Sequence, residues 1–148
     1  MADGSTKPPA NITEFNTIAG LVFAQLYESF PVPVEHFNER AIASAMGIPG
    51  DSSTHVLPSG RPFLQMVGHS LGWLIDEGYV RSTGLLARDR LSLTEKGLAT
   101  LNAVPEGLSA TVGSSLVKAS SESGQDWSGI GDLVGGIIGG FAKTMSGS

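Results

Sequence analysis

The sequence predicts a mainly α-helical protein of the α+β class, with one small β-hairpin and a glycine-rich helical tail at the C-terminus. Apolar residues recur at helical spacing over 12–30 and again over 63–75, the pattern of helices that bury one face. The pattern then changes to an alternation over 79–93, which is typical of a hairpin. After residue 125, glycines are interspersed among large apolar residues that again follow helical spacing.

Length and composition restrict the chemistry that the chain can perform. A chain of 148 residues is long enough for one core with appendages, and the lack of cysteine excludes disulfides, a thiolate nucleophile and a cysteine zinc site. The net charge is −5, and neither the segment 11–104 nor the segment after it is basic, so no overall field attracts a polyanion. Because the first residues lack the pattern of a secretory signal, we expect a cytoplasmic protein.

The N-terminal part of the chain is expected to be an arm followed by a long helix. Residues 1–10 contain nothing to bury, which predicts a mobile arm. The helix that follows has one continuous apolar stripe, and Asn11 and Glu14 have the spacing of a capping box at its start. Pro31 and Pro33 end it, so the PVPV segment is expected to be a short extended stretch or an edge strand.

Two further helices are predicted before the hairpin. The second covers about 35–46 and ends at Gly47; its inward residues are expected to be Phe37, Ala41, Ile42, Ala45 and Met46. A long turn-rich loop over 48–61 leads to the third helix, which has Pro62 in its first turn and stops at Gly78.

The hairpin is expected to pair 79–82 with 90–93 through the connection TGLLARD. Thr94 then caps a short helix that ends before Pro105. The predicted organisation is therefore a domain over 11–104, a weak helix and linker over 105–124, and a glycine-rich amphipathic tail over 125–148.

A pair of motifs lies in FLQMVGHSLGWLIDEGYVR (63–81) and RLSLTEKGLATL (90–101). The first ends with Leu74, Ile75, Glu77, Gly78, Tyr79 and Val80, and the second has Leu93, Thr94 and Gly97 spaced as Leu-Thr-x-x-Gly. Together they resemble the winged helix-turn-helix superfamily over about 18–104. This resemblance implies a winged-helix domain over 11–104, but not one function, since members include repressors, replication proteins and domains that bind only proteins.

In a DNA-binding winged helix the exposed face of the third helix enters the major groove. A helical projection puts Leu64, Gln65, Gly68, His69, Gly72 and Trp73 on or beside that face, with no Arg or Lys among them. Arg81, Arg88 and Arg90 near the hairpin form either a DNA-binding wing or an ordinary solvated hairpin. The glycines and Trp73 favour a protein partner for the third helix, although Trp73 could simply pack on its own domain.

The tail is predicted to associate with another surface. Its association residues are Trp127, Ile130, Gly131, Val134, Gly135, Ile138, Gly139 and Phe141, and Gly131, Gly135 and Gly139 have the spacing of closely packed helices. So many glycines make a lone helix unstable in water, which predicts that it orders only against a partner, a second copy, its own domain or a membrane surface. The uncharged run is too short for a transmembrane span.

Neither catalytic nor metal-binding motifs occur. His36, His55 and His69 lack zinc-site spacing, and no nucleophile, Walker or dinucleotide motif is present, so we expect neither an enzyme nor a cofactor. The leading hypothesis is a non-catalytic winged-helix interaction protein that forms a homo-oligomer. The alternatives are a DNA-binding transcriptional regulator that uses a basic wing and a protein that associates with membrane surfaces through its tail.

Overall fold

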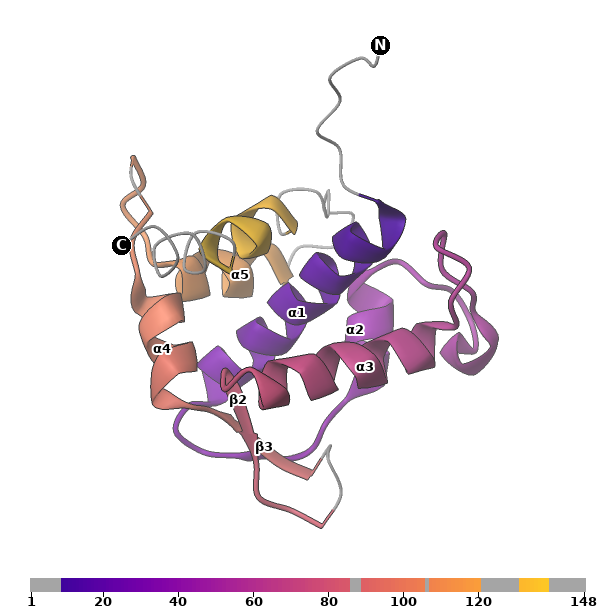
Figure 1. Cartoon of the computed structure of the whole chain (residues 1–148), viewed down its shortest axis with the longest axis horizontal. Coiled ribbons are helices and arrows are strands. Elements are labelled where there is room, and N and C mark those ends of the chain that lie inside the picture. Colours follow the sequence, from indigo (N-terminus) through magenta and orange to yellow (C-terminus); the bar gives the residue numbers. More distant parts are fainter. Residues whose placement is uncertain (1–8, 86–88, 106, 121–130, 139–148) are drawn as a thin grey trace.

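The computed structural model describes residues 9–85, 89–105, 107–120 and 131–138 (Figure 1). Its elements, in chain order, are α1 (Ala10–Ser29), β1 (Val34–His36), α2 (Glu39–Ala45), the short 3-10 helix η1 (Ser52–Thr54), α3 (Phe63–Asp76), β2 (Val80–Ser82), β3 (Asp89–Leu93), α4 (Glu95–Asn102) and α5 (Val112–Ser120). A further helical segment covers 131–138. The predicted order of helices and strands, and with it the α+β class, is confirmed.

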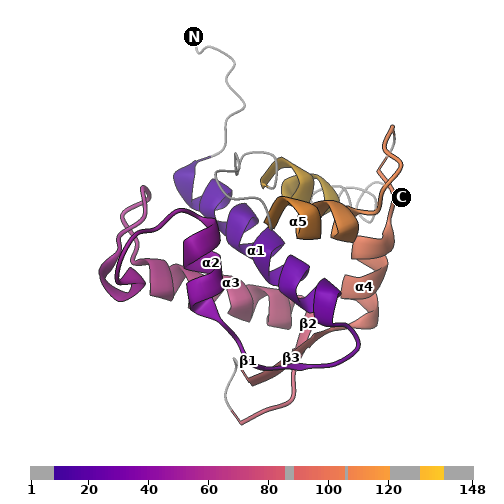
Figure 2. The same ribbon diagram turned by 180° about the vertical axis from the view of Figure 1, so that it is seen from behind.

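The central element is α1, which crosses the molecule between α3 and α5 (Figures 1 and 2). Its buried residues include the uninterrupted run 17–24. Such a run covers two turns of helix, so this middle part of α1 is enclosed on all sides. The prediction of a single apolar stripe was wrong because the chain returns after α4 and covers a second side of the helix.

The predicted capping box at the start of α1 was also wrong. The helix begins at Ala10, its N-cap is Pro9, and no side chain caps it. Glu14 is instead buried, at 6% exposure, and its two carboxylate oxygens accept hydrogen bonds from the Ser59 amide at 2.8 Å and the Ser59 hydroxyl at 2.6 Å. Glu14 therefore fastens the loop before α3 to the side of α1.

The second helix is shorter than predicted, because α2 begins at Glu39 and Asn38 caps it by accepting a hydrogen bond from the Ala41 amide at 3.2 Å. Ala41 was predicted to face inward but is exposed; Ala43 is buried instead. Phe37 is buried as expected, although it precedes the helix. Gly47 follows the helix with a φ of +75°, which confirms it as the residue that ends the helix.

The sheet has three antiparallel strands in the order β1-β3-β2. The predicted hairpin is confirmed by the register in which Val80 pairs with Leu93 and Ser82 with Leu91. The extended segment after Pro33 forms the edge strand β1, with Val34 opposite Leu91. Buried Leu91 and Leu93 join this sheet to the helical core.

The two sequence motifs meet where the sheet joins α3 and α4. The Thr94 hydroxyl accepts a hydrogen bond from the Gly97 amide at 3.0 Å, which confirms the cap of α4, and donates one to the Gly78 carbonyl. A Cβ atom on Gly97 would lie 2.2 Å from the carbonyl oxygen of Tyr79, so only glycine fits there. Gly78 has a φ of +88° and ends α3 as predicted. The motifs are therefore two halves of one junction.

The side of α1 opposite α3 is covered by α5 and by the segment 131–138. Val134 is fully buried, and Leu133, Ile137 and Ile138 pack against the same core. A Cβ atom on Gly135 would lie 3.2 Å from the side-chain nitrogen Nδ2 of Asn16, so glycine permits the close approach of this segment to α1. Within the described residues, no helix combines the length and apolar character needed to cross a bilayer.

Candidate protein-interaction surface

The outer face of α3 is solvent-accessible. Gln65, His69 and Trp73 are exposed, whereas Leu64, Gly68 and Gly72 are partly covered. The exposure of Gln65, His69 and Trp73 agrees with the helical projection made from the sequence, whereas Leu64 packs against the core. Trp73 is the largest side chain among them and is 39% exposed.

A groove of about 410 Å³ lies along one edge of this face, between α3 and the first turns of α1. Its lining residues are Asn11, Ile12, Phe15, Arg61, Met66, His69, Ser70 and Trp73. Apolar and aromatic side chains make up half of this lining, and Ile12 is 42% exposed. We call the outer face of α3 and this groove together the α3 surface.

Two aromatic rings of the same domain pack against Trp73. The Phe15 ring meets it edge-on with centroids 5.2 Å apart, and the Tyr79 ring stacks on it at 6.1 Å with an interplanar angle of 18°. The ammonium of Lys96 lies over the Tyr79 ring, 4.3 Å from its centroid. A half-exposed tryptophan that already packs against two rings has less side-chain freedom to lose on binding, which suits a residue that anchors an interface.

Burial is the main reason that the pKa of Tyr79 is raised, with the Glu77 carboxylate as a second cause. The phenol is therefore neutral near pH 7, and the stack on which Trp73 rests carries no charge from the tyrosine.

The contribution of α1 to the groove was missed by the sequence analysis. Ile12 and Phe15 were assigned to the buried stripe, and Asn11 to a cap. The available signal was the position of Ile12, one turn before the enclosed part of the helix, where fewer elements can cover a side chain. Arg61 was also missed because it lies in the loop before α3.

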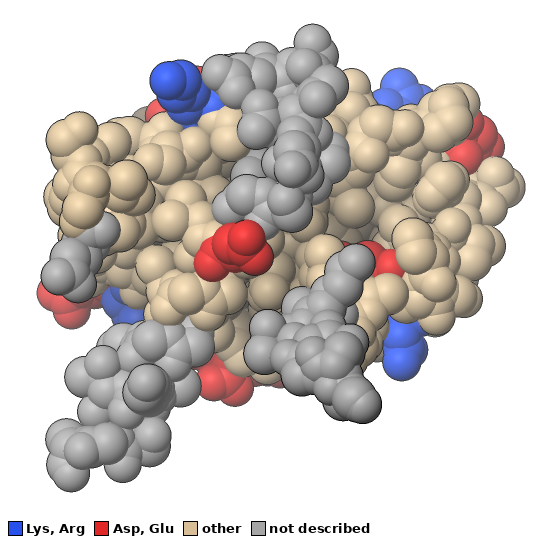
Figure 3. All heavy atoms as spheres, turned by 90° about the horizontal axis from the view of Figure 1, so that it is seen from above, with Lys and Arg blue, Asp and Glu red and all other residues tan. Residues whose placement is uncertain are grey.

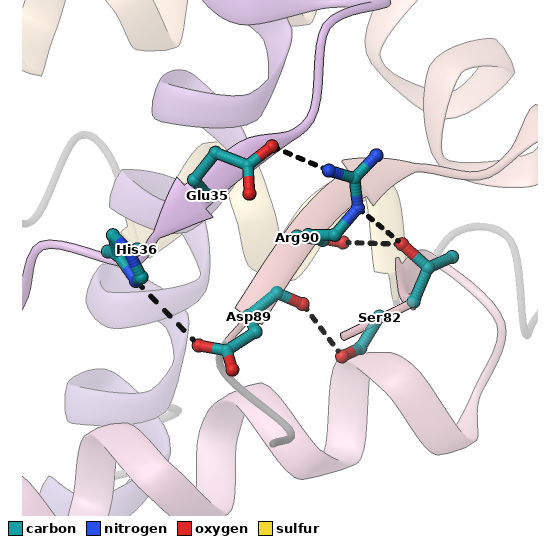
Figure 4. Close-up of polar contacts among 6 residues, drawn as sticks. Glu35, His36, Ser82, Asp89 and Arg90 are labelled. Atoms are coloured by element: carbon teal, nitrogen blue, oxygen red, sulfur yellow. Dashed lines mark hydrogen bonds and ion pairs between the residues drawn. The ribbon is translucent and has the colours of Figure 1, made fainter. Parts of the chain in front are cut away.

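Of the three arginines near the hairpin, Arg90 has partners in the neighbouring strand and loop (Figure 4). Arg90 is bound to Glu35 of β1 through its Nη1 atom at 2.7 Å and donates from Nε to the Thr83 hydroxyl at 3.3 Å. The neighbouring Asp89 lies 3.9 Å from Nδ1 of His36. Arg81 is exposed and has no ion pair with a described residue, whereas Arg88 lies outside the described residues.

On the face seen in Figure 3, the Lys, Arg, Asp and Glu side chains are scattered among uncharged residues, and blue and red side chains are interspersed rather than gathered by sign. Within the described part of the chain, no group of three His, Asp or Glu side chains is arranged to hold a metal ion.

Only some of the predicted association residues of the tail lie within the described residues. Gly131, Val134, Gly135 and Ile138 belong to the segment that packs on α1 of the same chain. Trp127, Ile130, Gly139 and Phe141 lie outside the described residues. The described part of the tail thus has an apolar partner within its own domain, which was one of the alternatives derived from the sequence.

Comparison with known proteins adds no relative: no family model, no curated protein and no solved structure matches this chain.

Proposed function

We propose that this protein is a non-catalytic winged-helix interaction protein that binds a protein partner through the α3 surface. The observation that carries the proposal is Trp73, which is half-exposed beside a partly apolar groove and packs against Phe15 and Tyr79. Exposed tryptophans next to apolar hollows are frequent centres of binding energy in protein interfaces. Such a surface suits an apolar side chain of a partner better than a phosphate backbone.

The assignment to the winged-helix type is supported by the arrangement of elements. Three helices precede a β-hairpin, a short edge strand joins the hairpin, and the motif residues Gly78, Tyr79, Thr94 and Gly97 contact one another at a single junction. A third helix with one exposed face is what the resemblance implies for the binding element of such a domain.

The charges on the α3 surface favour a protein over DNA. The outer face of the helix has no Lys or Arg, Arg61 is the one cation of the α3 surface, and Arg90 in the hairpin is already paired with Glu35. Neutralisation of phosphates by Lys and Arg supplies most of the affinity of non-specific DNA binding. A domain that lacks these groups on its third helix would need the hairpin to provide nearly all of them.

Site-specific photo-crosslinking in the native cells tests the proposal. A photoreactive benzoylphenylalanine replaces Gln65 on the α3 surface and, as a matched control, the exposed Ala99 on α4. We expect a discrete protein adduct from position 65, which Trp73→Ala abolishes and Trp73→Phe retains in part, and no adduct from position 99.

Titration of a mixed-sequence DNA duplex at low salt gives the opposing outcome. Micromolar or tighter binding that Arg88→Ala with Arg90→Ala removes would support the DNA-binding regulator and contradict the proposal. Absence of any adduct at position 65, with the protein folded, would contradict it as well.

A further inference from the structure

The charges at the two ends of α3 are arranged against the dipole of the helix. Arg61 lies immediately before its N-terminus, while Asp76 and Glu77 lie exposed at its C-terminus. Helices are normally stabilised by the reverse order, because the N-terminus has a partial positive charge and the C-terminus a partial negative charge. Both ends of α3 therefore present an excess of one sign.

Contacts within the chain neutralise this excess only in part. The Lys96 ammonium donates a hydrogen bond to the Glu77 carbonyl at 2.8 Å and so satisfies the backbone at the C-terminal end. Neither the Arg61 guanidinium nor the carboxylates of Asp76 and Glu77 form an ion pair with a described residue. The two charged ends are thus available to an external partner with the opposite order of charges.

Between these ends the helix has no Lys, Arg, Asp or Glu, and its outward side chains differ in size. Exposed Gln65 and His69 are followed by Gly72, where an added Cβ atom would meet nothing within 4 Å. A glycine in open space on the outer face of a helix has no side chain of its own, so a side chain of another surface can approach the backbone closely there; we call this uncovered position the recess at Gly72. The surface therefore offers both projections and a recess along one line.

We propose that the α3 surface binds a second copy of this chain, with the two α3 helices antiparallel about a two-fold axis near residues 68 and 69. The proposal rests on the proposed function and names its partner. This arrangement brings Arg61 of each copy beside Asp76 of the other and places Gln65 opposite Gly72. In a parallel arrangement Arg61 would instead lie beside its own symmetry mate, which like charges disfavour.

A second copy fits because the surface is complementary to itself. A two-fold interface uses one patch on both subunits, so each feature must find its counterpart in the same chain. The α3 surface meets this requirement in charge, through its two ends, and in size, through Gln65 and the recess at Gly72. A helix of 14 residues is only about 21 Å long, so we expect a weak dimer in the micromolar range.

An exchange of charges tests the antiparallel arrangement. Sedimentation velocity over about 1–500 µM measures the dimer dissociation constant of the full chain, of Arg61→Glu, of Asp76→Lys and of the double variant. We expect each single reversal to weaken the dimer at least about tenfold, because it creates two repulsive pairs. An equimolar mixture of the two single variants, and the double variant alone, should restore dimerisation because the opposite charges face each other again.

Control variants separate this effect from a change in net charge or in folding. Arg81→Glu and Glu28→Lys change the charge equally at exposed sites outside the α3 surface, and we expect them to leave the dimer unchanged. Circular dichroism verifies that each variant is folded. Arg61→Gln and Asp76→Asn remove the charges without reversing them and replace any reversal variant that unfolds, with a smaller expected weakening.

The possible results distinguish this proposal from the proposed function. A full chain that is monomeric up to about 500 µM overturns the second-copy proposal; an adduct from position 65 to a different protein would then leave the proposed function standing. Failure of both measurements overturns both proposals. A dimer that resists the single reversals, or that the mixture does not restore, overturns the antiparallel arrangement.

Discussion

The helices α1 and α3 lie side by side, but they differ in how much of their surface is buried. Residues 17–24 of α1 are buried all around the helix, whereas α3 buries one side and leaves Gln65, His69 and Trp73 exposed. Both helices are rich in apolar residues. The difference shows that α1 is used by its own domain for stability, while α3 keeps a surface that contributes little to the monomer and can be used for binding.

Truncation of the core of α1 should have the largest effect on stability. Phe23 is fully buried and its ring lies 5.9 Å from the ring of Tyr79. We expect Phe23→Ala to lower the free energy of unfolding by about 3–5 kcal/mol, because a large cavity forms in a region that cannot collapse. Urea denaturation measures this loss. A change below about 1 kcal/mol would contradict the view that the middle of α1 is fully enclosed.

Deletion of residues 125–148 tests whether the tail belongs to the enclosure of α1. The deletion removes Val134 and uncovers the side of the helix near Asn16 and Thr17. We expect a loss of about 2–3 kcal/mol from the buried apolar area, with no change in the oligomeric state. Thermal denaturation and light scattering of both chains measure these effects. A truncated chain of unchanged stability but lower oligomeric mass would assign the tail to association instead.

Removal of the buried Glu14 carboxylate of α1 should cause the next largest loss of stability. Glu14→Ala leaves the amide of Ser59 without its acceptor, and we expect a loss of about 2 kcal/mol. Ser59→Ala is the matched control, since it removes only the hydroxyl and retains the amide hydrogen bond. The free energies of unfolding of both variants should therefore differ, with the Glu14 variant the less stable.

The substitutions in α1 are expected to lower the free energy of unfolding, whereas a substitution on the exposed side of α3 is expected to raise it. Gly72 lies in the interior of the helix and a Cβ atom there meets nothing. We expect Gly72→Ala to raise the free energy of unfolding of the monomer by up to about 1 kcal/mol, because alanine is the better helix former. The same methyl group narrows the recess proposed to face Gln65, so dimerisation should weaken. A destabilised monomer would show that α3 is covered at this position.

The smallest expected effect is a dependence of stability on pH that comes from Tyr79, which contacts both Phe23 of α1 and Trp73 of α3. Burial first, and the Glu77 carboxylate second, raise the pKa of Tyr79, so the phenol ionises more easily in the unfolded chain. Its contribution to stability is complete below about pH 10 and is lost as the pH rises through the raised pKa. Urea denaturation at about pH 8 and pH 11 should show a smaller alkaline loss for Tyr79→Phe than for the wild type.

The sequence by itself determined the order of the elements and the positions of several ends. Periodicity located α1, α3 and the hairpin, and the glycines at 47 and 78 marked helix ends, because these signals depend on the backbone conformation of neighbouring residues. The exposed face of α3 followed from the same periodicity, since positions on one helix have fixed relative directions.

Contacts between distant segments were decided only by the tertiary structure. Glu14 has the spacing of a capping residue but binds Ser59, and Arg90 looks like a free wing cation but binds Glu35. The groove needs Ile12 and Phe15 from α1 beside Trp73 from α3, and no local pattern specifies that meeting. Spacing fixes which side of a helix a residue faces, whereas the partner on that side depends on how the whole chain packs.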